Sequence, residues 1–225
     1  MRIDEVQLAV PDLAAARAFY AGVLRLAELP ATDGLTFAAG RTRLALRAAP
    51  AGERPRYHLA FAVPLARFDA ARRLVAAQTP LIAADGDEVI EHAGWDAVAF
   101  YFRDPAGSIL ECIARRAGPA DAAGAPEAPA IGAVCEVGIV VDEVPAMAAT
   151  LRAELGVAPF RGSEGETFTA LGDDEGLLIV VRRGREWYPS TGLAAAPAPL
   201  QLALTLDDGS RRRLDGPPYR CRALA

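Results

Sequence analysis

The sequence repeats one local pattern: a short apolar strand, a turn that often contains Pro, and a helix. Apolar residues alternate along residues 6–10, which predicts a strand, and then recur at helical spacing over residues 13–23, which predicts a helix. The same order returns at residues 137–141 and Val144–Leu155, and the second helix should end at Gly156. Repeated strand–helix units of this kind favour sheets with helices packed on one face.

The two strongest copies of this pattern align without gaps at an offset of 131 residues. Glu5 falls on Glu136 near the start of each strand, and Phe37 falls on Phe168 further along. An ungapped match across a strand and a helix indicates an internal repeat, so the two segments should share one structure. We therefore expect Phe37 and Phe168 to occupy equivalent positions.

Two weaker copies extend the repeat. Residues 57–78, YHLAFAVPLARFDAARRLVAAQ, again predict a strand, a Pro turn and a helix. A fourth copy begins with PLQLALTLDDG at residues 199–209, and only a Pro- and Arg-rich tail follows its hairpin. We therefore predict an α+β fold of four βαβββ modules, with the fourth module truncated to strands.

A stretch rich in Ala, Pro and Gly separates the two strong copies. It consists of RRAGPADAAGAPEAPA over residues 115–130 and has the composition of a linker. We therefore expect a first domain at residues 1–115 with modules one and two, and a linker at residues 116–131. A second domain at residues 132–225 would hold module three and the truncated module four.

Composition and charge argue against several classes of function. The net charge of −5 does not favour a nucleic-acid-binding surface, and no apolar run is long enough to span a membrane. The first residues enter a strand pattern directly, without the regions typical of a signal peptide. Three Cys without Cys-x-x-Cys spacing indicate neither a zinc knuckle nor a disulfide framework. We expect a cytoplasmic protein that binds neither nucleic acid nor membrane.

Three polar residues interrupt apolar strands at corresponding places in the modules. They are His58 on the first strand of module two, Glu111 on its last strand, and Glu136 on the first strand of module three. Side chains alternate across a strand, so His58 shares its face with Ala60, and Glu136 shares its face with Gly138. Small neighbours leave room above the polar groups, which favours a concave site.

One imidazole and two carboxylates can hold a divalent metal and leave positions open for a substrate. Two carboxylates favour Mn²⁺, Fe²⁺ or Mg²⁺ over Zn²⁺, which prefers nitrogen and sulfur ligands. Taken singly, a strand His is more often a core residue, and a strand Glu more often faces water. Their equivalent places in the repeat favour a metal site made of His58, Glu111 and Glu136.

At these residues the chain resembles a known superfamily. The segments IDEVQLAVPDLAAARAFY, YHLAFAV and DPAGSILE are similar to signatures of the vicinal oxygen chelate superfamily. Its members include glyoxalases, fosfomycin- and bleomycin-resistance proteins and extradiol dioxygenases. The resemblance implies paired βαβββ modules that form curved half-barrel sheets. The superfamily motif Asp-Pro-x-Gly-Asn/Ser-x-x-Glu is matched by Asp104, Pro105, Gly107, Ser108 and Glu111.

Within this superfamily the chain is most similar to the toxoflavin lyases, single-chain enzymes that use Mn²⁺ and dioxygen. Segments such as LGDDEGLLIVV and GREWYP carry this similarity, and the lyases' metal set falls on His58, Glu111 and Glu136. In fosfomycin-resistance dimers the partner chain supplies one ligand. The resemblance thus implies that module three replaces the partner here and that one chain forms a pseudo-dimer. The mirror site would carry Gln201 in place of His and should be degenerate.

No separate general base stands out in the sequence. Glu5 fits a hydrogen-bonded residue or a solvent-facing strand end, Glu175 an exposed turn or the rim of the pocket, and His92 a polar surface loop or a lid over the substrate. The loops at residues 80–97 and 183–198 should shape the substrate pocket. Neither loop carries a motif that identifies the substrate.

Two further groups of residues have simple explanations. Tyr101, Trp187 and Tyr188 fit either an aromatic wall of the site or the hydrophobic core. Cys112 and Cys135 each lie next to a candidate ligand in the sequence. Strand alternation therefore predicts that both Cys side chains point away from the metal, into the core beneath the helices.

The leading functional hypothesis is a metal-dependent enzyme that chelates two neighbouring oxygen or nitrogen atoms of a small substrate. Mn²⁺ or Fe²⁺ would favour oxygen-dependent ring degradation, and Mg²⁺ or Zn²⁺ would favour isomerisation or thiol addition. One alternative is a metal-free protein that sequesters a small molecule or antibiotic, and another is a regulatory or chaperone-like protein that keeps only the fold. The expected partners are a small-molecule substrate and, on the oxidative route, O₂. Both a monomer and a homodimer fit the sequence.

Overall fold

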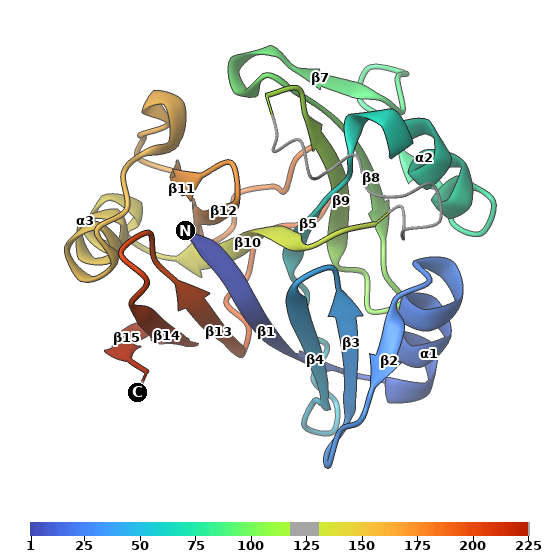
Figure 1. Cartoon of the computed structure of the whole chain (residues 1–225), viewed down its shortest axis with the longest axis horizontal. Helices are drawn as coiled ribbons and strands as arrows, with labels where there is room; N and C mark the ends of the chain where they lie inside the picture. Colours follow the sequence, from blue (N-terminus) through green and yellow to red (C-terminus); the bar gives the residue numbers. More distant parts are fainter. Residues whose placement is uncertain (118–130, 225) are drawn as a thin grey trace.

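Two open β-sheets with helices packed against them make up the chain, as Figure 1 shows. The computed structural model describes residues 1–117 and 131–224, and most of the expected linker at 116–131 lies outside these residues. In chain order the elements are β1 (Arg2–Val10), α1 (Leu13–Arg17), β2 (Ala27–Leu29), β3 (Leu35–Ala39), β4 (Thr42–Ala48), β5 (His58–Ala62), α2 (Phe68–Ala76), β6 (Leu81–Ile82), β7 (Ile90–His92), β8 (Ala97–Arg103), β9 (Ile109–Arg115), β10 (Val134–Val141), α3 (Val144–Leu155), β11 (Phe168–Asp173), β12 (Gly176–Arg182), β13 (Leu200–Thr205), β14 (Arg211–Gly216) and β15 (Arg220–Ala223).

Each sheet combines one module from each half of the chain. The strand order β15-β14-β13-β1-β4-β3-β2 joins modules four and one, and β11-β12-β10-β5-β9-β8-β6, with β7 paired to β8, joins modules three and two. The first strands of the modules pair antiparallel at each centre, β1 with β13 and β10 with β5. The predicted α+β pseudo-dimer of paired modules is confirmed, and module four consists of strands alone. The domain boundaries at 115 and 132 stay a prediction.

The helices follow the local sequence signals, with one exception. Helix α3 has Pro145 in its first turn and ends at Gly156, whose φ of +66° suits a residue without a Cβ. The first helix is less regular than its apolar spacing predicts, because α1 passes into a π-helical turn at Ala18–Val23. No helix in residues 1–117 or 131–224 is both long and apolar enough to cross a membrane.

Strand register corrects one part of the repeat alignment. Val6 on β1 and Phe37 on β3 pair with the same residue of β4. Val137 on β10 and Leu171 on β11 likewise pair with the same residue of β12. Leu171, and not Phe168, is therefore the counterpart of Phe37. The ungapped alignment was wrong here because Leu171 lies 34 positions after Val137, whereas Phe37 lies 31 positions after Val6, so module three has three additional residues in this stretch.

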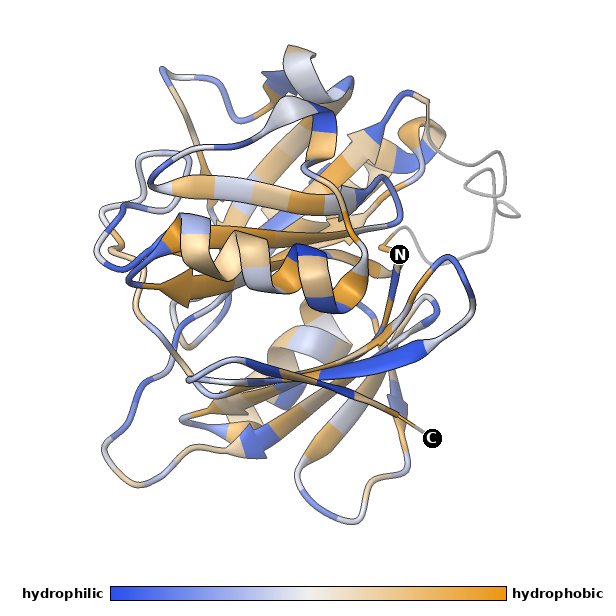
Figure 2. Cartoon of the chain, turned by 90° about the vertical axis from the view of Figure 1, so that its left-hand side faces the viewer, coloured by the Kyte–Doolittle hydropathy of each residue, from blue (hydrophilic) through white to orange (hydrophobic). Residues whose placement is uncertain are grey.

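Apolar residues gather on two sides of the second sheet. The larger core lies beneath the helices and receives Leu59 and Phe61 of β5, as the alternation predicts. A smaller cluster on the opposite face receives Ala60, together with Tyr101 and Trp187. Colouring by hydropathy shows the apolar residues concentrated along the strands and many hydrophilic residues in the loops (Figure 2). The face with this smaller cluster of small and aromatic residues also carries the candidate site.

Candidate metal centre

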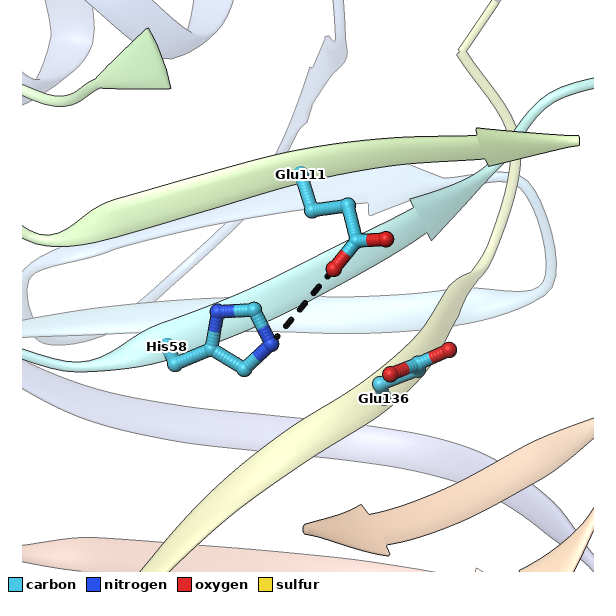
Figure 3. A group of neighbouring side chains, drawn as sticks. All are labelled: His58, Glu111 and Glu136. Atoms are coloured by element: carbon cyan, nitrogen blue, oxygen red, sulfur yellow. Dashed lines mark ion pairs between the residues drawn. The ribbon is translucent and has the colours of Figure 1, made fainter. Parts of the chain in front are cut away.

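Three neighbouring strands bring the predicted ligands together. Ala60 on β5 pairs with Glu111 on β9 and also with Glu136 on β10, so both carboxylates flank the same residue. His58 lies two residues before Ala60 and therefore projects from the same face. Figure 3 shows the imidazole and the two carboxylates projecting from these three strands, with the Glu111 carboxylate directed at the imidazole.

The three side chains form a close and buried group, which we call the triad. One ligand atom from each of His58, Glu111 and Glu136 lies within 4.8 Å of the others. His58 Nε2 is 3.6 Å from Glu111 Oε2. The residues are only 6%, 3% and 2% exposed, respectively. Within the described residues, this is the only group of three or more His, Cys, Asp or Glu side chains that could hold a metal ion.

Burial dominates the electrostatics of the triad. It lowers the pKa of His58 to about 4, so the imidazole is neutral near pH 7. Burial, with the nearby charge of Glu136, raises the pKa of Glu111 well above its usual range. Burial also raises the pKa of Glu136. A divalent cation would compensate the two carboxylate charges, and one neutral nitrogen with two carboxylates suits Mn²⁺, Fe²⁺ or Mg²⁺. The residues present therefore fit a divalent metal.

Arg115, the last residue of the expected first domain, also belongs to the site. Its Nη2 donates a hydrogen bond of 2.5 Å to Glu136 Oε1, and its Nε lies 3.2 Å from Asp174 Oδ1. The side chain is 5% exposed. Arg115 thus fixes the orientation of the Glu136 carboxylate. The strand alternation that runs through Glu111 and Ile113 reaches Arg115, and this signal could have identified it.

The turn before β9 sets the position of Glu111. Asp104 Oδ1 accepts a hydrogen bond from Ser108 N at 2.8 Å, and Asp104 Oδ2 accepts one from Tyr20 Oη at 3.2 Å. Gly107 has a φ of +86°, which favours a residue without a Cβ. The Asp-Pro-x-Gly-Ser part of the motif therefore acts structurally, because it determines where β9 begins beside β5.

An aromatic cavity of about 340 Å³ adjoins the triad. Trp187 stacks on His58 with ring centroids 5.1 Å apart and planes inclined by 26°. This stacking depends on Gly138, because a Cβ there would lie 2.6 Å from Cη2 of Trp187. The predicted aromatic wall is present, and the full lining is His58, His92, Trp95, Tyr101, Glu111, Glu136, Phe168, Ile179, Arg185, Trp187 and Tyr188.

Comparison with known proteins places the first half of the chain. The family model for the Glyoxalase/Bleomycin resistance protein/Dioxygenase superfamily matches residues 2–112. This match supports the resemblance of the chain to that superfamily. The superfamily includes glyoxalases and dioxygenases, so its members include enzymes. No curated protein matches the chain in sequence.

Solved structures extend the likeness to the superfamily fold across both halves. Glyoxalase I from Zea mays is 15% identical with a TM-score of 0.58, and the match covers 96% of this chain and 89% of that one. A dioxygenase candidate from Bacillus subtilis subsp. subtilis str. 168 is 18% identical with a TM-score of 0.60. That match covers 80% of this chain and 63% of the other, so this chain spans less than two thirds of the Bacillus protein. At these identities the two structures establish the fold.

His92 lines the cavity, which agrees with a residue beside the substrate pocket and not with one in a surface loop. Its Nε2 is 2.9 Å from Tyr101 Oη, and its ring meets those of Trp95 and Tyr188. Burial lowers the pKa of His92. The residue reaches the cavity because the short strand β7 pairs with β8, which also carries Tyr101. No local signal could have shown this, because the pairing joins a polar loop to a buried strand.

Cys135 also differs from the expectation. Cys112 packs in the core beneath the helices, as alternation predicts, but Cys135 lies on the face of the site. The pairing of β10 with β5 shifts register between Val134 and Glu136. Such a bulge puts two successive side chains on one face. Cys135 therefore lies beside Glu136, and its thiol is 3.6 Å from Arg115 Nη1.

The mirror positions on the first sheet carry different chemistry. Ala203 pairs with Glu5 and with Arg213, just as Ala60 pairs with the two triad carboxylates. Arg213 thus occupies the place of Glu111, and Gln201 occupies the place of His58. Glu5 is 3.8 Å from Arg43 at the surface. A guanidinium cannot ligate a metal, so this arrangement differs from the triad in its chemistry.

Glu175 lies away from the cavity. Its carboxylate Oε2 is 3.7 Å from Arg41 Nη2, and Arg41 also donates a hydrogen bond to the Glu175 carbonyl oxygen at 3.1 Å. It is absent from the cavity lining among the described residues. The exposed-turn interpretation of Glu175 therefore agrees with its position between β11 and β12.

Proposed function

We propose that the chain is a metal-dependent enzyme and that His58, Glu111 and Glu136 are its metal ligands. The observation that carries this proposal is the convergence of the three buried side chains within 4.8 Å beside an aromatic cavity. We favour Mn²⁺, with Fe²⁺ and Mg²⁺ as alternatives, because two of the three ligands are carboxylates. A bound divalent cation would act as a Lewis acid on two neighbouring donor atoms of the substrate, and Mn²⁺ or Fe²⁺ would also permit chemistry with O₂.

The substrate in this proposal is a small planar heteroaromatic ring or a molecule with vicinal oxygens. The cavity of about 340 Å³ suits a small ligand, and Trp187, Tyr101 and Phe168 offer aromatic surfaces to a flat ring. The resemblance to toxoflavin lyases favours oxygen-dependent ring degradation as the reaction. Because Glu136 comes from module three of the same chain, the proposed site needs no second copy.

A metal-free sequestering protein is the main alternative, and the triad argues against it. Binding a flat molecule by stacking needs the aromatic residues alone. It gives no reason to bury two carboxylates beside an imidazole, because burial raises the pKa of both acids and, within the described residues, Glu111 has no charged partner of the kind that Arg115 provides for Glu136. A metal ion supplies the counterion.

Metal analysis and a turnover assay together test the proposal. Purified protein, with and without reconstitution, would be analysed for Mn, Fe, Mg and Zn beside the variants Glu111→Ala and Glu175→Ala. We expect about one metal per chain in the wild type and in Glu175→Ala, and its loss in Glu111→Ala. Metal-loaded protein would then be screened for O₂ consumption with planar heteroaromatics.

The outcomes separate the alternatives. Metal with turnover supports the enzyme. No metal after reconstitution with excess Mn²⁺, Fe²⁺, Mg²⁺ and Zn²⁺ contradicts it, and stoichiometric ligand binding in that state would establish the sequestering function instead. Metal binding that survives in Glu111→Ala would contradict the assigned ligands.

A further inference from the structure

Arg185 is a cation in the cavity without an acidic partner. It lies in the connection between β12 and β13, is partly buried and lines the same cavity as the triad. Its only side-chain hydrogen bond within the described residues goes from Nη1 to the Glu186 carbonyl oxygen at 3.3 Å. No carboxylate of residues 1–117 or 131–224 lies within 4.0 Å of its guanidinium nitrogens.

Two nearby arginines are neutralised by carboxylates, and within the described residues Arg185 is not. Arg115 is paired with Glu136, and Arg183 is paired with Asp142 at 2.6 Å. Even the acid next to Arg185 is engaged elsewhere, because Glu186 Oε1 accepts a hydrogen bond from Gly192 N at 2.6 Å. Arg185 therefore retains guanidinium donors for a ligand.

Its position is defined by the surrounding structure. The backbone of Arg185 accepts a hydrogen bond from Ala195 N at 2.7 Å, which holds the loop against itself. The guanidinium carbon lies 5.1 Å from the centroid of the Phe168 ring. Its charge is close enough to the triad to lower the pKa of His58, and burial lowers the pKa of Arg185 itself. The cation is thus partly desolvated beside the proposed metal.

We propose that Arg185 binds an oxyanion of the substrate, so that the cavity takes a planar aromatic acid whose chelating atoms meet the triad. This inference rests on the proposed metal-dependent function and narrows its substrate class. A guanidinium presents paired donors that match a carboxylate, and such charge-assisted bonds are stronger than neutral ones. Phe168 and Trp187 then provide surfaces for the aromatic ring between the two anchoring points.

Charge balance makes this recognition dependent on the metal. Without a metal, an acidic ligand meets Arg185 alone and has no ion to chelate. A divalent metal adds two positive charges beside Glu111 and Glu136, and Glu136 is already paired with Arg115, so the cavity then holds a surplus of positive charge that favours an anion. We therefore expect an acidic ligand to bind the metal-loaded chain and to bind the metal-free chain poorly.

Three probes with the same vicinal oxygens test the role of Arg185. Catechol carries no acid, whereas 2,3-dihydroxybenzoate and 3,4-dihydroxybenzoate add a carboxylate at different positions. Their dissociation constants would be measured by calorimetry on Mn²⁺-loaded protein under nitrogen. We expect at least one acid to bind about tenfold or more tightly than catechol, as a charge-assisted pair would allow.

Two variants make the comparison specific. Arg185→Met should bring the dissociation constant of the acid within about threefold of that of catechol, both measured on protein whose Mn²⁺ occupancy has been established by EPR. Arg182→Met is the matched control, because Arg182 is exposed and does not line the cavity, so the preference should remain. Arg185→Lys, which keeps the charge but loses the fork, should retain part of the preference.

The results that would overturn the role of Arg185 differ from those that would overturn the proposed metal site. If Mn²⁺ binds but neither acid is preferred to catechol, Arg185 does not select an anion. If the preference persists in Arg185→Met, or disappears equally in Arg182→Met, the assignment to Arg185 is wrong. Failure of Mn²⁺ to bind, measured by EPR before any probe is added, would contradict the metal site itself.

Discussion

Replacing Glu111 by Gln should have opposite effects on the metal-free and the metal-loaded protein. Glu111 is 3% exposed, and its pKa is raised well above the usual value of 4.5 by burial and then by the charge of Glu136. The folded state therefore holds the carboxyl proton more tightly than the unfolded state does. The resulting stability is fully present below pH 4.5 and is lost as the pH rises through the folded pKa.

The size of this effect follows from the pKa difference. Each unit between the folded and unfolded pKa corresponds to about 1.4 kcal/mol of stability lost at high pH. Gln carries no charge, so metal-free Glu111→Gln should melt above the metal-free wild type at pH 8 and close to it at pH 4. A stability gain of about 1 kcal/mol raises Tm by roughly 2–4 °C for a chain of this size.

Bound metal should reverse the order of the melting temperatures of Glu111→Gln and the wild type. Mn²⁺ at about one hundred times its Kd should stabilise the wild type by about 2.7 kcal/mol, or roughly 5–11 °C in Tm. Glu111→Gln loses an ionised ligand, so most of this increase should disappear. Glu5→Gln is a control at a mirror position of the triad, where the side chain is 41% exposed and paired with Arg43.

Calorimetric melting in EDTA and in excess MnCl₂, from pH 4 to pH 8, tests the expectations for the metal-free and the metal-loaded protein. The reasoning is refuted if Glu111→Gln melts below the wild type in EDTA at pH 8. It is equally refuted if Mn²⁺ raises the Tm of Glu111→Gln as much as that of the wild type. Glu5→Gln should follow the wild type in both conditions.

Three other substitutions probe the support of the site. Gly138→Ala should displace Trp187 and weaken metal binding while the fold is kept. The displacement of Trp187 should change the near-ultraviolet circular dichroism spectrum, and an unchanged spectrum would contradict the packing of Trp187 against Gly138. Arg115→Met should lower the free energy of unfolding, measured in urea, by about 3–5 kcal/mol, because it leaves Glu136 buried without its partner. A loss below about 1 kcal/mol would contradict a stabilising Arg115–Glu136 pair. Asp104→Ala should cost about 1–3 kcal/mol and reduce Mn²⁺ affinity, since the turn that positions β9 loses its acceptor; wild-type stability by the same assay would show the turn is dispensable.

Local periodicity was sufficient to predict the modules and the shared face of the three proposed ligands. Alternation along single strands put His58 and Glu136 beside small residues, and the strand pairing then placed both carboxylates opposite Ala60. These inferences depend only on the twofold period of a strand. The fold could be predicted because the repeat presents that period several times.

Longer-range geometry could not be obtained in this way. A bulge at Val134–Glu136 turns Cys135 toward the site, and three additional residues between β10 and β11 shift the counterpart of Phe37 from Phe168 to Leu171. His92 enters the cavity only through the pairing of β7 with β8. Each depends on partners that are distant or on register shifts, which a hydrophobic pattern does not encode.

The most direct test of the metal site is pulsed EPR of bound Mn²⁺, because the chain has only two histidines. The Mn²⁺ signal should show modulation from one ¹⁴N ligand in the wild type and in His92→Gln. The modulation should be absent from His58→Gln at a Mn²⁺ concentration that restores occupancy. Nitrogen coupling that survives in His58→Gln, or that is missing from the wild type, would contradict a metal centre built on His58, Glu111 and Glu136.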